Sequence, residues 1–283
     1  MTTDRPVTMR RLIEAAADTL AAAGIDAARV DAELLAAHAA GTDRGLLAFT
    51  EPGPGFADRY AELTAARATR VPLQHLTGTA PFGPVVLDVG PGVFVPRPET
   101  ESMLEWALAQ PLPAAPLIVD LCTGSGALAI ALAAEVPAAR VIGVDDCDTA
   151  LAYASRNTRD TGVELVQADV TRAGVLADLD GSVDLVVANP PYIPLGAALD
   201  PEVEQHDPAH ALFGGEDGMS VIVHLAGLAA RLLRRGGRCA VEHDDTTSAR
   251  TVDQFVATGC FVEVRARHDL TGRPRFVTAV RGE

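Results

Sequence analysis

In the segment Asp184-Leu-Val-Val-Ala-Asn-Pro-Pro-Tyr192, an apolar run ends in a stiff polar turn. A run of Leu and Val closed by two prolines predicts a buried central strand, and open α/β sheets carry their chemistry at the carboxyl ends of such strands. Each proline fixes its own φ and holds the residue before it near extended geometry, so the turn is rigid before any ligand binds. We therefore expect Asn189 at the mouth of a site.

This turn suits a planar NH2 group. The side-chain carbonyl of Asn189 and the backbone carbonyl of Pro190 offer two neighbouring hydrogen-bond acceptors, and Pro191 leads on to Tyr192, whose ring can pack on a flat group. We predict Asn189, Pro190 and Tyr192 as catalytic residues. The alternative is that Asn-Pro-Pro is an ordinary turn without a chemical role, and the surrounding motifs must decide between the two.

From residue 117 onward, apolar runs alternate with helix-period stretches, which is typical of a parallel sheet covered by helices. The segment 261–281 is expected to add an antiparallel pair, with Gly272 and Pro274 at its turn. The predicted strands lie near 117–121, 140–145, 163–167, 183–188 and 237–242, and the predicted helices near 126–134, 148–158, 219–235 and 246–258. The fold class is α/β.

The first strand runs into a glycine loop, Leu117-Ile-Val-Asp-Leu-Cys-Thr-Gly-Ser-Gly-Ala127. Gly124 and Gly126 let the backbone approach a ligand closely, and the helix that follows presents free N–H groups. We expect an adenosyl cofactor there. Asp145 ends the next strand, where a carboxylate can accept hydrogen bonds from both ribose hydroxyls.

The same loop also satisfies the dinucleotide pattern G-x-G-x-x-A, so a nicotinamide-dependent enzyme is an alternative. No hydride-transfer partner is evident, however. Asp120 before the loop and the Asn-Pro-Pro-Tyr turn resemble the pattern of methyltransferases that act on exocyclic or amide nitrogens, and this resemblance implies a methyltransferase. Asp169 ends the third strand, where the amino group of adenine would lie. Its other interpretation is a plain strand-end turn.

Composition bounds the possible partners and the compartment. A chain of 283 residues suggests two domains, and 38 acidic against 23 basic residues give a net charge of −15, which argues against a nucleic-acid substrate. The four cysteines form no Cys-x-x-Cys pair, as expected for reduced thiols. Because the sequence has no signal core and no bilayer-spanning apolar run, we expect a cytoplasmic protein with no membrane partner.

The N-terminal part differs in texture from the rest. Residues 8–70 are rich in Ala and Leu at helix spacing and predict a small helical domain for packing or partner recognition. Thr100 or Glu99 is expected to begin the helix that follows the linker. Short β-type runs at 71–78, 85–89 and 93–95 predict a bridging hairpin, which gives domains at 1–75 (helical), 76–100 (hairpin linker) and 101–283.

With these residues in place, the chain resembles the peptide chain release factor N5-glutamine methyltransferases, the HemK or PrmC family. The segment Phe94-Val-Pro-Arg-Pro-Glu-Thr-Glu101 resembles the characteristic linker of this family and separates it from ribosomal-protein glutamine methyltransferases, which stay an alternative. Similar segments cover nearly the whole chain, at 31–38, 70–78, 94–101, 207–218 and 269–275.

The resemblance implies a class I S-adenosylmethionine-dependent, Rossmann-like domain that methylates the glutamine of the Gly-Gly-Gln loop in class 1 release factors. Carried over by position, it implies Cys122, Thr123, Gly124, Ser125 and Gly126 for the methionine side of the cofactor, Asp145 for the ribose, Asp169 and Val170 for the adenine, and Asn189, Pro190, Pro191 and Tyr192 for the glutamine amide, with Asn189 also beside the cofactor. The chain departs from the family at Gly83, Val170 and Asp244, where relatives often carry an aromatic residue, Trp and Gly.

Other signals are weaker. His206 and His210 are four residues apart, but Pro208 between them argues against a metal site. The cluster 242–245 at a strand end is expected to be a solvated or cofactor-adjacent acidic rim rather than a metal site. The remaining rivals are an adenine-N6 nucleic-acid methyltransferase, which uses the same Asn-Pro-Pro-Tyr geometry, and a non-catalytic adaptor.

Overall fold

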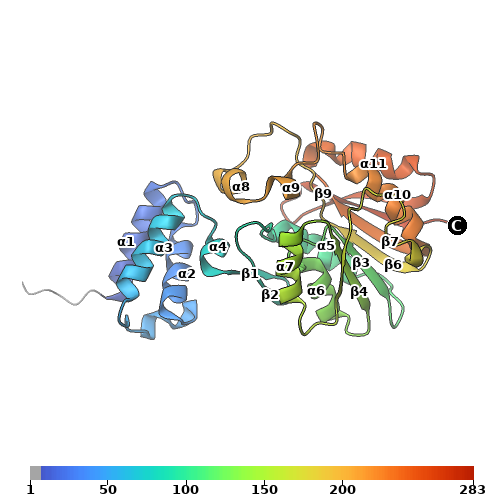
Figure 1. The fold of residues 1–283 in the computed structure, drawn as a ribbon. Helices are drawn as coiled ribbons and strands as arrows, with labels where there is room; N and C mark the ends of the chain where they lie inside the picture. Colours follow the sequence, from blue (N-terminus) through green and yellow to red (C-terminus); the bar gives the residue numbers. More distant parts are fainter. Residues whose placement is uncertain (1–7) are drawn as a thin grey trace, which may run out of the picture. The chain divides into compact units, whose positions relative to one another are not determined.

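The computed structural model describes residues 8–283. The chain folds into two compact units (Figure 1). The helical unit contains the chain up to Thr79 together with Asp200–His206. The sheet unit contains Ala80–Leu199 and Asp207–Glu283. Within the described residues, no helix has both the length and the apolar character needed to cross a bilayer.

The sheet unit is built on a seven-stranded sheet in the order β5-β4-β3-β6-β7-β9-β8. The first five strands in this order are parallel, whereas β9 pairs antiparallel with both β7 and β8. This confirms the predicted α/β class and the antiparallel final pair. The strands are β3 Leu117–Leu121, β4 Arg140–Asp145, β5 Glu164–Gln167, β6 Val183–Ala188, β7 Leu233–Glu242, β8 Phe261–His268 and β9 Pro274–Arg281.

Helices cover both faces of this sheet, with α5, α6 and α7 on one face and α10 and α11 on the other (Figure 1). Successive strand residues alternate between the two layers: Ile118 packs in the core under the first face and Val119 in the core under the second. The helices of the unit are α5 Pro98–Leu108, α6 Ala127–Glu135, α7 Asp148–Asn157, α9 Ala209–Leu212, α10 Ile222–Leu232 and α11 Ser248–Ala257, with short 3-10 turns η2 Ala177–Leu179 and η3 Asp245–Thr247.

The central strand β6 lies between β3 and β7, and all six of its residues are buried. Its one acidic residue, Asp184, is satisfied because its carboxylate accepts the backbone N–H of Leu117 and pairs with Arg234. Burial on both faces explains why β6 reads as a continuous apolar run.

The hairpin consists of β1 Thr79–Phe82 and β2 Val85–Asp88, and two neighbouring runs predicted as β-type are not strands. Leu73–Thr77 forms the short helix α4, which starts after Pro72 and ends at the left-handed Gly78. Val93 and Val95 pair with no strand, although each is only 1% exposed in the core. Their apolar character therefore reflects burial and not β pairing.

Two further boundaries differ from the prediction. Strand β7 begins at Leu233, which is buried and pairs with Val183, whereas the sequence predicted helix to residue 235. Gly236 at φ 74° accommodates the irregularity that follows. Helix α5 begins at Pro98, so neither Glu99 nor Thr100 is its cap.

The helical unit packs its apolar side chains around Leu20, Leu35 and Phe56. A buried cation connects distant segments of this unit: the Arg67 guanidinium forms ion pairs with Asp31 and Glu202, each at 2.7 Å. Segment 200–206 thus belongs to this unit although it lies far along the chain. The helices are α1 Met9–Ala22, α2 Ala28–Ala40, α3 Phe56–Ala68, α4 Leu73–Thr77 and α8 Pro201–His206, with the 3-10 turn η1 Arg44–Phe49.

Replacing Arg67 by Met should destabilise the helical unit, because two carboxylates then lose a buried partner. Such a loss costs about 3 kcal/mol, which corresponds to about 100-fold faster hydrogen exchange of the most protected amides in α2 and α3. The matched control is Arg10→Met, which removes an exposed pair with Glu14. Exchange by mass spectrometry that is equally fast in both variants would contradict the expectation.

Candidate active site

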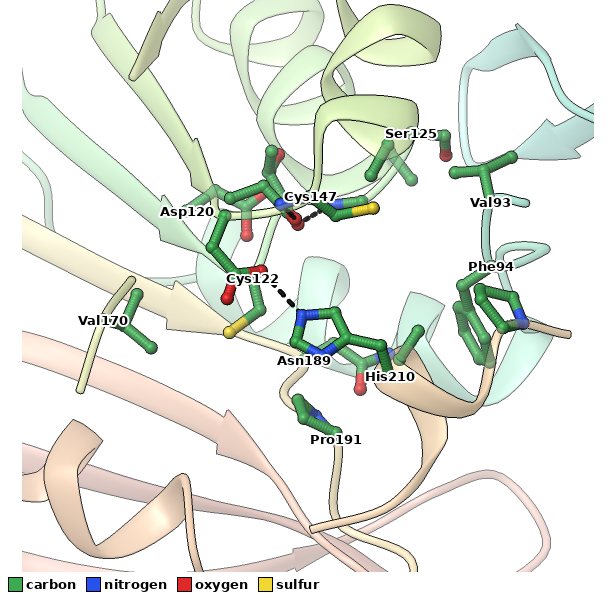
Figure 2. Close-up of a pocket in the computed structure, with 18 of the residues that line it drawn as sticks. Val93, Phe94, Asp120, Cys122, Ser125, Cys147, Val170, Asn189, Pro191 and His210 are labelled. Atoms are coloured by element: carbon green, nitrogen blue, oxygen red, sulfur yellow. Dashed lines mark hydrogen bonds and ion pairs between the residues drawn. The ribbon is translucent and has the colours of Figure 1, made fainter. Parts of the chain in front are cut away.

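Three parallel strands end side by side at one edge of the sheet. Strand β3 pairs with both β4 and β6, and Leu121 lies opposite Ala188. Consequently Cys122 after β3, Asp145 at the end of β4 and Asn189 after β6 lie close together. They border a pocket of about 340 Å³ within the sheet unit (Figure 2).

The pocket wall contains most of the residues predicted to bind the cofactor: Cys122, Thr123, Gly124, Ser125, Asp145, Asp169, Val170 and Asn189. Gly126 is not in the wall. It has φ 90°, and a Cβ there would lie 2.9 Å from the Ile130 side chain, so this glycine permits close packing of α6. Of the predicted substrate residues, Asn189 and Pro191 line the pocket, whereas Pro190 and Tyr192 are not among the lining residues.

The loop after β3 presents its backbone to the pocket. At Gly124, φ is 58° and a Cβ would meet no atom within 4 Å, so its pocket side is open. Cys122 also has a positive φ, 61°, which costs a non-glycine residue about 1 kcal/mol. Burial and the neighbouring carboxylates of Asp145 and Asp120 raise the pKa of the Cys122 thiol.

Asp120 is a buried carboxylate at the base of this loop, with 1% of its surface exposed. Its Oδ2 accepts hydrogen bonds from the Thr123 hydroxyl at 2.6 Å and from the Ala129 N–H at 3.1 Å. Its Oδ1 is buried with no partner among residues 8–283, although the residue lines the pocket. Burial raises the pKa of Asp120 to about 7.

Asp145 lies across the loop from Asp120. Its two oxygens accept the N–H groups of Gly124 at 2.8 Å and Cys147 at 3.0 Å. Burial raises the pKa of Asp145, and these two hydrogen bonds oppose that rise. Since each carboxylate oxygen has two lone pairs, each can accept one further hydrogen bond from a ligand.

Asp169 lies two residues beyond the end of β5 and makes a local turn. Its Oδ1 accepts both the N–H and the hydroxyl of Thr171, and these hydrogen bonds lower the pKa of Asp169. The strand-end turn considered from the sequence is therefore present, and Asp169 lines the pocket as well. The neighbouring Val170 is buried against the second core and contributes an apolar wall.

Asn189 is held by a chain of hydrogen bonds that reaches into the core. Its Nδ2 donates to the Thr100 hydroxyl at 3.2 Å, and that hydroxyl donates to Glu242 Oε2 at 2.8 Å. The Tyr192 hydroxyl donates to Glu242 Oε1 at 2.7 Å. This hydrogen bond fixes the hydroxyl end of Tyr192, and the packing of its ring on a flat group stays a prediction.

Thr100 lines the pocket and bonds Glu242, and the sequence analysis predicted neither contact. The acidic rim was expected to be solvated or cofactor-adjacent. Glu242 is 1% exposed and His243 is fully buried, so the solvated alternative is wrong for both, whereas the cofactor-adjacent alternative stays a prediction. Asp244 instead caps η3 by accepting the Thr246 N–H. The available signals were the place of Thr100 in the 94–101 segment and of Glu242 at a strand end.

The predicted histidine pair is divided between the units. His206 lies in α8 of the helical unit, whereas His210 lines the pocket and contacts Asp146 at 2.7 Å. The hydrogen bond to Asp146 raises the pKa of His210. Across residues 8–283, no group of three or more His, Cys, Asp or Glu side chains is arranged to hold a metal ion.

Comparison with known proteins first defines the class. The Methyltransferase small domain model matches residues 101–206, and the PrmC N-terminal domain model matches residues 11–78. A solved methyltransferase from Pyrococcus furiosus has a TM-score of 0.52 at 17% identity, covering 70% of this chain and 89% of that chain, and so shares the fold. Fold and pocket together define a Rossmann-like methyltransferase.

The family follows from closer relatives. The release factor glutamine methyltransferase of Mycolicibacterium smegmatis is 65% identical over 274 residues, covering 96% of this chain and 98% of the relative. The chain belongs to the release factor glutamine methyltransferase family, which confirms the resemblance found in the sequence. A similar protein of Streptomyces pristinaespiralis, named 4-amino-L-phenylalanine/4-methylamino-L-phenylalanine methyltransferase, is 42% identical over 284 residues, covering 97% of this chain and 95% of the relative.

The raised pKa of Asp120 should make the ligand-free sheet unit less stable as pH rises from about 5 to 7. The folded-state pKa of about 7 exceeds the unfolded value of about 3.9, so the folded state holds the proton more tightly between these values and loses stability as the proton leaves. Asp120→Asn cannot titrate, and it is close in shape to the protonated acid.

The measurement is urea unfolding of both proteins at pH 5, 6, 7 and 8, followed by the fluorescence of Trp106, the single Trp of the chain, which lies in α5. The free energy of unfolding of the wild type minus that of Asp120→Asn should fall with pH. A constant difference would contradict the assignment.

Proposed function

We propose that this chain transfers a methyl group from S-adenosylmethionine to the side-chain amide nitrogen of a glutamine in peptide chain release factors. The observation that supports this best is the state of Asn189. Its Nδ2 is occupied by Thr100, whereas its accessible Oδ1 accepts no hydrogen bond from residues 8–283. A free acceptor in the wall of a methyltransferase pocket suits an incoming N–H bond.

The pocket residues fit S-adenosylmethionine. The unpartnered Oδ1 of Asp120 is a buried carboxylate oxygen suited to a positively charged ligand, and the open side of Gly124 leaves room against the backbone. When bound, S-adenosylmethionine supplies a methyl group activated by a positively charged sulfur. We assign its methionine side to Cys122, Thr123, Gly124 and Ser125, its ribose to Asp145, and its adenine to Asp169 and Val170.

The task of the chain is to present a weak nucleophile. An amide nitrogen shares its lone pair with the carbonyl, so the site must hold it in position and favour charge on nitrogen. In our proposal Asn189 Oδ1 accepts an N–H bond of the substrate amide, whereas Pro190, which does not line the pocket, keeps the turn in place together with Pro191 and Tyr192. Orientation and preorganised dipoles are then the main catalytic contributions. No general base is evident, and the proton that the methylated amide loses would pass to water or to the acceptor oxygens.

Within this function, the sequence resemblance narrows the target to the Gly-Gly-Gln glutamine of class 1 release factors in the cytoplasm. We assign residues 1–75 to partner recognition, 76–100 to a linker and 101–283 to catalysis. The net charge of −15 disfavours nucleic acid as the direct substrate. The aminophenylalanine methyltransferase relative makes a free amine the second substrate class to test.

Gly124→Ala should weaken S-adenosylmethionine binding about tenfold or more, because the added methyl group would occupy the open pocket side. The matched control is Gly162→Ala, since Gly162 also has a positive φ (73°) and open space around its Cβ position but lies outside the pocket wall. Calorimetric titration should show a large loss of affinity only for Gly124→Ala. An equal loss in both variants would point to backbone strain instead.

The function is tested with labelled S-adenosylmethionine and four acceptors: a class 1 release factor, its loop Gln→Ala variant, an adenine-containing oligonucleotide and 4-aminophenylalanine. We expect label only on the intact release factor. Asn189→Ala should lower turnover about 100-fold while sparing cofactor binding, by analogy with the loss of one preorganised hydrogen-bonding group. Label on adenine or on the arylamine would overturn the proposal, and wild-type turnover in Asn189→Ala would remove this residue from it.

A further inference from the structure

The hydroxyl of Thr100 lies between Asn189 and the buried Glu242 and is hydrogen-bonded to both. It lies 3.2 Å from Asn189 Nδ2 and 2.8 Å from Glu242 Oε2. Thr100 is 4% exposed and Glu242 is 1% exposed, so water does not compete strongly for these bonds. The two residues come from the first turn of α5 and the last position of β7.

The direction of each hydrogen bond in this chain follows from counting protons. An ionised carboxylate can only accept, so the one proton of the Thr100 hydroxyl points to Glu242. The hydroxyl oxygen then has only a lone pair to offer Asn189, which must turn its NH2 group toward Thr100. As a result, Asn189 Oδ1 points away from Thr100 and stays available as an acceptor.

Two neighbouring groups support the ionised form of Glu242. The Tyr192 hydroxyl donates to its second oxygen at 2.7 Å, and the positive charge of Arg275 acts on the same carboxylate. Burial raises the pKa of Glu242, whereas Tyr192, Thr100 and Arg275 oppose that rise. In this geometry both hydroxyls donate to the Glu242 carboxylate, one to each oxygen.

A side-chain amide does not by itself fix which of its two ends, the carbonyl or the NH2 group, faces the pocket. Rotation by half a turn about its last bond exchanges the carbonyl and the NH2 group with little change in shape. With the NH2 group facing the pocket, Asn189 would donate a hydrogen bond and would suit a carboxylate. With the carbonyl facing the pocket, Asn189 would accept a hydrogen bond and would suit an amide. These two states differ in the substrate they select, because specificity is a difference of two affinities.

We propose that Thr100 and Glu242 are positioning residues that lock Asn189 as an acceptor, and that this lock makes the site select a glutamine side chain over a glutamate side chain. The inference rests on the proposed function and adds to it the source of selectivity. Neither residue needs to touch the substrate, since both act through Asn189.

The test compares a release factor carrying the loop glutamine with its Gln→Glu variant. Dissociation constants of both are measured in the presence of the demethylated cofactor, S-adenosylhomocysteine, for the wild type, Thr100→Val and Thr100→Ser. The glutamine preference is the dissociation constant of the Glu form divided by that of the Gln form. This ratio should be about tenfold lower in Thr100→Val than in the wild type, whereas Thr100→Ser, which keeps the hydroxyl, should retain the wild-type ratio. General charge repulsion of glutamate cancels because only the ratio is compared between variants.

Thr251→Val is the matched control, since Thr251 is a fully buried threonine of α11 outside the pocket wall. It should leave the ratio unchanged. If Thr100→Val does not fold, as judged by Trp106 fluorescence, the smaller Thr100→Ala gives the same readout.

Different outcomes refute the proposed function and the positioning role. A wild type that places no methyl group on glutamine refutes the proposed function. An active wild type whose glutamine preference survives in Thr100→Val refutes the positioning role alone. Loss of preference in both Thr100→Val and Thr100→Ser also refutes it, because the hydroxyl would then not be the cause.

Discussion

The site depends on one constraint, the parallel pairing of β3 with both of its neighbours. Because β3 pairs with β4 on one side and β6 on the other, the residues that follow these strands meet at the same edge. The glycine loop, Asp145 and Asn189 come from three separate parts of the chain and are neighbours for this reason alone. A shift in the register of β6 would move Asn189 away from the loop and leave two unrelated half-sites.

The carboxylates around the pocket are held by opposing effects. Burial alone would drive Asp120 and Glu242 to take up protons, and hydrogen bonds from threonine hydroxyls and backbone N–H groups work against it. Asp120 retains one unpartnered oxygen, whereas both oxygens of Glu242 are engaged. The first therefore has capacity left for a ligand, and the second serves the protein internally.

Much of the fold could be predicted because its strongest signals are local. The bounds of β3, β4 and β6 agree with the predicted strands, since burial on both faces leaves a continuous apolar run that a sequence displays directly. Val93 and Val95 misled the prediction because a buried loop and a strand share the same apolar composition. Leu73–Thr77 misled it because Pro72 and Gly78 delimit a helix as readily as a turn.

The residues of the site also fall into those that the sequence indicates and those that only the structure reveals. Asp120, Gly124 and Asn189 stand in contiguous motifs, so their residue types and spacing sufficed to find them. Thr100 and Glu242 are 142 residues apart, and only the packed structure brings them together. The local sequence does not indicate that the Thr100 hydroxyl donates to a carboxylate at the end of β7 instead of to a group in its own helix.

The membership of segment 200–206 in the helical unit bears on how this protein can be dissected. A fragment ending at Thr79 would keep Arg67 and Asp31 but lack Glu202, and the complementary fragment would carry Glu202 without its cation. Cutting the gene between the two parts therefore leaves the buried Arg67 with one of its two carboxylates and the partly exposed Glu202 with none of its cations from the helical part. Exchange of the helical part for another module would therefore also have to replace segment 200–206.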